Sequence, residues 1–158
     1  GQKWERHTRS GPSTYIFDAV TDRSGENLYV LTLDGIRRFN QSTRTEQLFF
    51  QPEIPSNTVR DGLIDKNDHL WVVFDNTGQG VGRYDGRRWQ FIHTGNSNLP
   101  FGGLSFIAID TSKTDIWVAG SFGVARLRAD RSWEIHSSQQ ISGNSNWYVQ
   151  GLVIDRFN

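Results

Sequence analysis

The sequence predicts an all-β fold, built from a four-stranded unit that repeats along the chain. Aspartates that end a predicted first strand stand at positions 22, 65, 110 and 155, so the spacings are 43, 45 and 45 residues. Each repeat contains short runs rich in Val, Ile and aromatic residues, separated by Gly, Asn and Asp, which is typical of strands and tight turns. No apolar stripe with the roughly 3.6-residue period of a helix is present. Four antiparallel strands in a repeat of about 45 residues are typical of a β-propeller blade.

The second repeat contains the clearest set of predicted strands, over residues 58–64, 70–74, 80–84 and 89–93. Asn67-Asp68 separates the first two runs and Asp85-Gly86 separates the last two, so both connections have the residues of tight hairpins. The third run begins at a glycine in every repeat, at Gly35, Gly80 and Gly123. Because each blade buries its faces on its neighbours, we expect the repeats to stack on one another.

The repeats predict a β-propeller segment of about three and a half four-stranded blades. We expect an outer strand at 4–8, complete blades at about 14–50, 58–94 and 104–137, and the inner strand of a further blade at 148–155. A ring needs about four blades or more, so we expect the remaining blades to come from a longer chain or from a second copy. Open strands at the two ends favour self-association. The absence of Met predicts a processed form or a segment of a longer protein.

The composition argues against several classes of protein. Lys plus Arg and Asp plus Glu both number 17, with no basic run, which disfavours a nucleic-acid partner. No apolar stretch approaches the roughly 20 residues of a membrane span, so we expect no direct membrane insertion. The lack of Cys excludes disulfides and thiolate metal sites. His7, His93 and His136 fall on separated outer strands and His69 in a turn, so we expect no metal site and no cofactor.

Three kinds of residue recur at fixed places in the repeat. Tyr29, Trp71 and Trp117 stand mid-strand between apolar neighbours, which favours packing in the core over a role as stacking platforms. Arg38, Arg83 and Arg126 recur on the third strand, where an anion-binding ring is conceivable, but we favour hydrogen bonds and ion pairs between blades. The aspartates that end the first strands are expected to accept hydrogen bonds from turn amides.

The segment from Pro55-Ser56-Asn57-Thr58-Val59 to Trp89 resembles the two-component regulator propeller repeat. The third repeat keeps Ile116-Trp117-Val118-Ala119-Gly120 and Gly123-Val124-Ala125-Arg126 of that pattern, and the first repeat has Tyr29 in place of the Trp. The resemblance implies bacterial sensor modules that are mostly extracytoplasmic and are joined through a membrane helix to kinase or cyclase machinery. It therefore implies a periplasmic or extracellular location for this chain.

The candidate ligand site follows from the positions of the loops in a propeller. Loops from a fourth strand to the next first strand, and from a second to a third strand, open on one face around the axis. Here they carry amides and aromatic rings, which suit a glycan, a peptide or another small molecule; the simpler alternative is that Asn and Ser only form turns. The predicted ligand-binding residues are Asn57, Arg60, Asp75, Asn76, Asn98, Phe101, Phe122, Asn146, Trp147 and Tyr148.

These observations predict a non-enzymatic ligand-sensing or interaction module of a bacterial two-component-type sensor. One alternative is a glycan-binding, lectin-like propeller assembled from short chains. Another is a fragment of a propeller-based lyase or hydrolase, since propellers host such chemistry, although the fold alone does not argue for it. No Ser, His and Asp set has the motif context of nucleophilic catalysis, so no catalytic residues are predicted.

Overall fold

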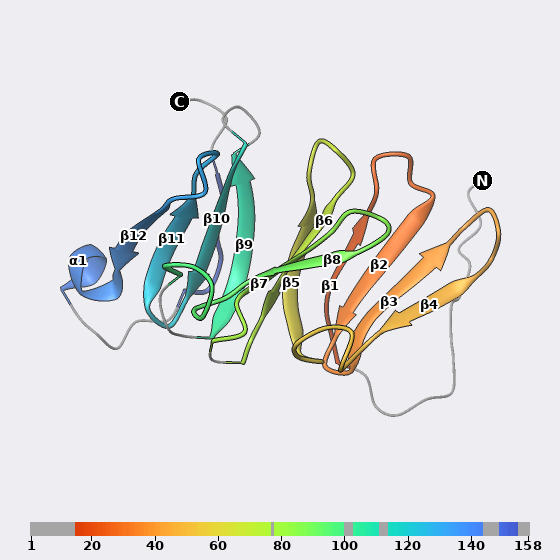
Figure 1. Ribbon diagram of the computed structural model, residues 1–158, viewed down its shortest axis with the longest axis horizontal. Coiled ribbons are helices and arrows are strands. Elements are labelled where there is room, and N and C mark those ends of the chain that lie inside the picture. Colours follow the sequence, from red (N-terminus) through yellow and green to blue (C-terminus); the bar gives the residue numbers. More distant parts are fainter. Residues whose placement is uncertain (1–14, 77, 100–102, 111–113, 144–148, 155–158) are drawn as a thin grey trace.

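Three antiparallel sheets, each of four strands, make up the part of the chain that the computed structural model describes, which is residues 15–76, 78–99, 103–110, 114–143 and 149–154. Within each sheet the strands pair in the order in which they occur in the sequence. The sheets lie side by side along the longest dimension of the molecule (Figure 1). The all-β prediction and the four-stranded unit are confirmed, and the three sheets do not close into a ring.

The strand bounds follow the repeat. Sheet 1 contains β1 (Ile16–Thr21), β2 (Asn27–Thr32), β3 (Gly35–Asn40) and β4 (Glu46–Phe49). Sheet 2 contains β5 (Val59–Ile64), β6 (Leu70–Phe74), β7 (Val81–Tyr84) and β8 (Trp89–Ile92). Sheet 3 contains β9 (Leu104–Asp110), β10 (Asp115–Gly120), β11 (Gly123–Leu127) and β12 (Trp133–Ser137).

The core is divided between the two gaps that separate the sheets. Successive side chains on a strand point to opposite faces, so Val72 packs with Leu31 and Phe49 between sheets 1 and 2, whereas Val73 packs with Leu104 and Val118 between sheets 2 and 3. Sheet 2 is therefore covered on both faces. Sheets 1 and 3 each keep one face that no other described sheet covers.

The glycine that begins each third strand has a steric cause. Gly35 has a φ of 116°, and a Cβ built on it would lie 2.2 Å from the carbonyl oxygen of Phe49. Gly123 has a φ of 127°, and its Cβ would lie 2.3 Å from the carbonyl oxygen of His136. The third strand therefore starts so close to the end of the fourth strand that only glycine fits there.

Two features differ from the expectations. A short helix, α1 (Ser138–Ser142), follows β12, because Ser137 and Gln140 form a reciprocal capping box and Gly143 ends the helix in a left-handed conformation. Residues 149–154 form no strand, where we expected an inner strand at 148–155. A strand needs a partner for its backbone groups, and residues 149–154 belong to none of the three described sheets. The outer strand expected at 4–8 lies outside the described residues.

The first strand of every sheet contains a bulge at its second residue. In sheet 2, Val59 pairs with Phe74 but Asp61 pairs with Val73, which leaves Arg60 as the extra residue. The strand pairing likewise leaves Phe17 as the extra residue in β1 and Ser105 as the extra residue in β9. A bulge bends the strand and redirects a side chain. Because β5 lies beside both β1 and β9, the three redirected positions occur on neighbouring inner strands.

Candidate functional site

The bulges bring Phe17 and Arg60 together across the gap between sheets 1 and 2. The guanidinium carbon of Arg60 lies 4.5 Å from the centroid of the Phe17 ring, which is a cation–π contact. The two residues occupy the same position in successive repeats, so the repeat places an aromatic ring beside a cation. Phe17 and Arg60 are the second residues of β1 and β5, so their contact lies at the end of these strands opposite the hairpins that join β1 to β2 and β5 to β6.

Asp75, which directly follows β6, holds the guanidinium of Arg60. Arg60 donates from Nε and Nη2 to the same oxygen, Asp75 Oδ2, at 2.9 and 2.6 Å. The two side chains remain 40% and 32% exposed, so a molecule in solution can reach them. Gly103 lies against Asp75 as well, because a Cβ on it would be 2.5 Å from the Asp75 carbonyl oxygen. The backbone that leads into β9 of sheet 3 therefore lies next to the cluster formed by Phe17, Arg60 and Asp75.

Two of the predicted ligand residues instead stabilise loops. Asn76 donates from Nδ2 to Ser56 Oγ at 2.9 Å, and Asn57 accepts from the backbone N–H of Gln51 at 2.7 Å. Phe122 packs against the core between sheets 2 and 3, and Asn98 is exposed. The structure thus brings Arg60, Asp75 and Asn76 to one end of sheet 2. Four predicted residues lie outside the described part of the chain: Phe101, Asn146, Trp147 and Tyr148.

A pair of carboxyl groups, Asp18 and Asp61, occupies the next position along the inner strands. Asp61 accepts from the backbone N–H of Ile107 in β9 at 2.8 Å and from that of Gly62 at 2.9 Å. Burial raises the pKa of the Asp61 carboxyl to about 6, and the neighbouring Asp18 contributes in the same direction. Asp61 therefore links sheets 2 and 3 and can take up a proton near neutral pH.

Asp22 and Asp65, at the opposite end of the sheets, have the structural role that we predicted for the aspartates that end the first strands, whereas Asp155 lies outside the described residues. Asp65 accepts from the backbone N–H groups of Asn67 and His69 and from Nε1 of Trp71, at 2.8, 3.0 and 2.9 Å. Burial alone would raise the pKa of Asp65, but these hydrogen bonds outweigh burial and lower it. Asp22 accepts from the turn amide of Glu26 in the same way, at 2.9 Å.

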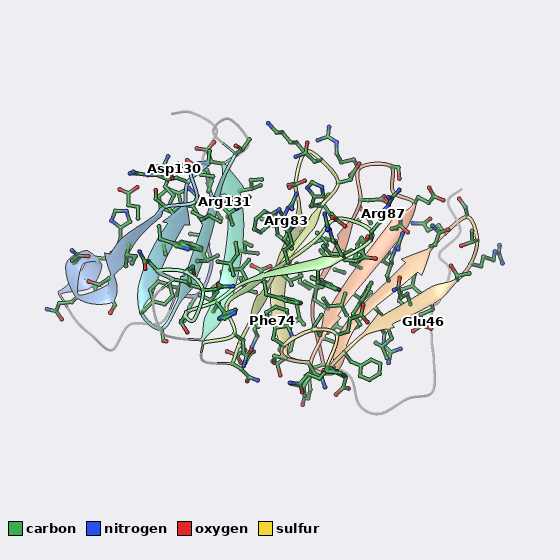
Figure 2. The ribbon with its side chains drawn as sticks, viewed as in Figure 1. Glu46, Phe74, Arg83, Arg87, Asp130 and Arg131 are labelled. Atoms are coloured by element: carbon green, nitrogen blue, oxygen red, sulfur yellow. The ribbon has the colours of Figure 1, made fainter. Side chains whose placement is uncertain are left out.

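The recurrent arginines stack within their own sheets. The guanidinium carbons of Arg38, Arg83 and Arg126 lie 6.0, 5.7 and 5.3 Å from the ring centroids of Tyr29, Trp71 and Trp117. In each case the ring belongs to the cross-strand neighbour of the arginine. Arg83 is labelled on sheet 2 in Figure 2. The expectation that these arginines mainly bond between blades is therefore wrong, although Arg38 also interacts with the hydroxyl of Tyr84 in sheet 2.

The aromatic partners are placed differently with respect to the core. Tyr29 belongs to the cluster between sheets 1 and 2, and Trp71 packs against the cluster between sheets 2 and 3, as we predicted. Trp117 instead is half-buried and stacks on His136, with 6.3 Å between the ring centroids.

Sequence reasoning missed Phe17, Asp18 and Asp61. The signal that could have found them is the alignment of the repeats on Asp22, Asp65 and Asp110. That alignment places a carboxylate at the same position of the first strand in two repeats, where an apolar residue is expected. Among the described residues, no three or more His, Asp and Glu side chains are grouped so that they could hold a metal ion.

No family model and no curated protein matches this sequence. Solved structures do share its fold. One is the extracellular domain described as part of a hybrid two-component system from B. thetaiotaomicron, with 23% identity over 96% of this chain and a TM-score of 0.71. A second such domain from the same organism has 16% identity over 90% of this chain and a TM-score of 0.70. An ancestral GH74 enzyme has 14% identity over 78% of this chain and a TM-score of 0.59.

The chain spans about a fifth of the length of these structures, at 20%, 20% and 18%. At these identities the likeness establishes the fold. No helix within the described residues has the length and apolar character needed to cross a membrane.

Proposed function

We propose that this chain is an arc of a β-propeller that senses a ligand, without catalysing a reaction, in the extracytoplasmic part of a bacterial two-component-type sensor. The likeness to extracellular domains of such systems supports the proposal, as does the resemblance of the repeat. Both also support a periplasmic or extracellular location. In this proposal the remaining blades come from a longer chain or from a second copy.

The contact between Phe17, Arg60 and Asp75 carries the proposal. The two hydrogen bonds that Arg60 donates to Asp75 both go to Oδ2. In this proposal Oδ1 of Asp75 accepts from the ligand and Nη1 of Arg60 donates to it. The Phe17 ring supplies an apolar surface beside these polar groups. An aromatic surface with a few oriented polar groups is the usual composition of a small-molecule site.

Calorimetry on the 158-residue chain tests this assignment, after a thermal-shift screen of oligosaccharides and short peptides. We expect Phe17→Leu and Arg60→Met to weaken the binding of a confirmed ligand at least tenfold. Arg37→Met is the matched control, because Arg37 pairs with Glu46 on β3 and β4, at 2.7 Å, away from this cluster. Equal affinity in all four proteins would place the ligand elsewhere and refute the assignment.

Glycan binding by a lectin-like propeller of short chains is the alternative that the cluster itself favours. A sugar offers hydroxyl pairs to Asp75 and Arg60 and an apolar ring face to Phe17. Selective binding of oligosaccharides, with no peptide bound, would support it. The lyase or hydrolase alternative is motivated by the carboxyl pair Asp18 and Asp61. Turnover of a bound ligand that is lost in Asp61→Asn would support that alternative and contradict the non-enzymatic proposal.

A further inference from the structure

The third-strand arginines can be compared in register, because each has one neighbour on the second strand and one on the fourth. The fourth-strand neighbours are Gln47 for Arg38, Gln90 for Arg83 and Glu134 for Arg126. The residues that contact the three guanidinium groups at the start of the second strand are Asn27 and Asp115, which begin β2 and β10, and His69, which directly precedes β6. The third-strand arginine thus has different electrostatic surroundings in each of the three sheets.

In sheet 3 the arginine is neutralised by two carboxylates. Arg126 donates from Nε to Asp115 Oδ2 at 2.9 Å, and its Nη1 lies 3.4 Å from Glu134 Oε2. Both acids come from the strands that flank β11. The positive charge of Arg126 is therefore compensated within sheet 3 and does not attract an anionic ligand.

In sheet 1 the same positions are neutral. Arg38 donates from Nε to the amide oxygen of Asn27 at 3.0 Å, and Gln47 stands where sheet 3 has its glutamate. The carboxylate of Asp22 accepts a hydrogen bond from Nδ2 of Asn27 at 2.6 Å. None of the ion pairs between described residues includes Arg38. Within the described part of the chain, no carboxylate therefore compensates its positive charge at contact distance.

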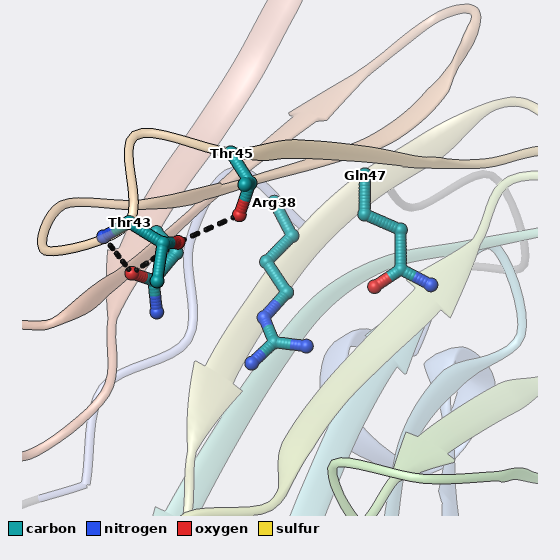
Figure 3. Close-up of a pocket in the computed structure, with 5 residues that line it drawn as sticks. Arg38, Thr43, Thr45 and Gln47 are labelled. Carbon is teal, nitrogen blue, oxygen red and sulfur yellow. Dashed lines mark hydrogen bonds between the residues drawn. The ribbon is translucent and has the colours of Figure 1, made fainter.

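A pocket of about 110 Å³ opens directly on this charge. It is lined by Arg38, Asn40, Thr43, Thr45 and Gln47. Figure 3 shows the guanidinium between Thr45 and Gln47, with no hydrogen bond drawn to either. The hydroxyls of Thr43 and Thr45 bond to each other at 2.8 Å, and Asn40 accepts from the backbone and hydroxyl of Thr43. Arg38 also interacts with the hydroxyl of Tyr84, and its remaining guanidinium N–H groups and the amide of Gln47 can donate to a group bound in the pocket.

We propose that this pocket binds a small tetrahedral oxyanion, sulfate or phosphate, either as the free ion or as the end of a monoester. A planar guanidinium presents two parallel N–H groups to such an anion, and hydrogen bonds between charged partners are the strong ones. Glu26 accepts from Nδ2 of Asn40 at 3.4 Å, whereas Thr43 donates to Oδ1 of the same residue. The proposal is independent of the Arg60 cluster, which lies at the other end of the sheets.

Calorimetric titration with sodium sulfate, sodium phosphate and methyl phosphate, at constant ionic strength, tests the proposal. We expect at least one of the three anions to bind, and Arg38→Gln to weaken that binding at least tenfold. Tighter binding of methyl phosphate than of inorganic phosphate would indicate a monoester ligand, and the reverse would indicate the free ion. Arg37→Gln is the control, because it removes the same charge from the adjacent residue of β3, which faces Glu46.

Gln47→Glu tests the electrostatic argument without removing the arginine. It installs the acid that sheet 3 has at this register position, so we expect it to keep the fold and to abolish anion binding. Thermal unfolding of every variant, without added anion, checks that the fold is retained. Unchanged binding in Arg38→Gln or in Gln47→Glu, or no binding of any of the three anions to the unmodified chain, would overturn the proposal.

Discussion

Asp61 in the first strand of sheet 2 accepts a hydrogen bond from the backbone N–H of Ile107 in the first strand of sheet 3, at 2.8 Å. The same carboxyl group lies beside Asp18 of sheet 1. One side chain thus connects all three inner strands. It is also a side chain whose protonation changes in an accessible pH range, which gives the first prediction.

The contribution of Asp61 to the free energy of unfolding should increase as the pH falls from about 7.5 to 4.5. The pKa of Asp61 in the folded chain, about 6, lies above its ordinary value of 3.8. The folded state therefore binds a proton that the unfolded state does not yet bind, so protonation stabilises the fold until the pH falls below the unfolded value. Urea unfolding at several pH values measures this.

Asp61→Asn is the reference for that measurement, since an asparagine keeps an acceptor oxygen but does not titrate. The difference in unfolding free energy between the two proteins should change with pH in the stated direction. A difference that stays constant between pH 7.5 and 4.5 would show that the pKa of Asp61 is not raised.

Asp65→Ala should destabilise the chain by about 2–3 kcal/mol, because it removes the acceptor of several hydrogen bonds to a largely buried carboxylate. The affected donors include the indole N–H of Trp71 and two turn amides. Asp85→Ala is a suitable comparison, since Asp85 accepts from two amides of an exposed turn, where water can replace it. Equal losses in chemical denaturation for the two variants would contradict this account.

Gly35→Ala should destabilise sheet 1 by at least about 2 kcal/mol, because the new Cβ meets a backbone oxygen and the φ is unfavourable for alanine. Gly86→Ala separates the two causes, since Gly86 also has a positive φ, 90°, but no heavy atom within 4 Å of its Cβ position. The melting temperature should fall further for Gly35→Ala. The opposite order would mean that φ, not the approach of Phe49, determines the requirement for glycine.

The chain should self-associate, because one face of sheet 1 is covered by no other described sheet and carries exposed apolar side chains such as Leu48, which is 38% exposed. Analytical ultracentrifugation should detect species larger than the 18.1 kDa monomer at micromolar concentration. Leu48→Lys should shift the distribution toward the monomer. A single monomeric species, fully folded by circular dichroism, would disprove the prediction.

The fold was predictable because its signals are local and repeated. Hairpin residues such as Asp85-Gly86 and the mid-strand position of Trp71 can be recognised within a single repeat. The same pattern recurs in three repeats, which strengthens the prediction. The capping box of Ser137 and Gln140 was missed because it forms one isolated helical turn and has no apolar period. The inner strand expected at 148–155 was wrong for the described residues 149–154, because strand formation depends on a partner, and propensity alone does not supply one.

The sequence by itself determined the repeat, the four-stranded sheets, the packing of Tyr29 and Trp71 and the turn role of Asp22 and Asp65. All of these depend on neighbours within one repeat or on the alternation of side chains along a strand. Only the tertiary structure decided that Phe17 meets Arg60, that Asp61 reaches Ile107, and that Arg38 lacks the acids that surround Arg126. These relationships depend on bulges and on the register between strands, where a shift of one residue turns a side chain to the other face of the sheet.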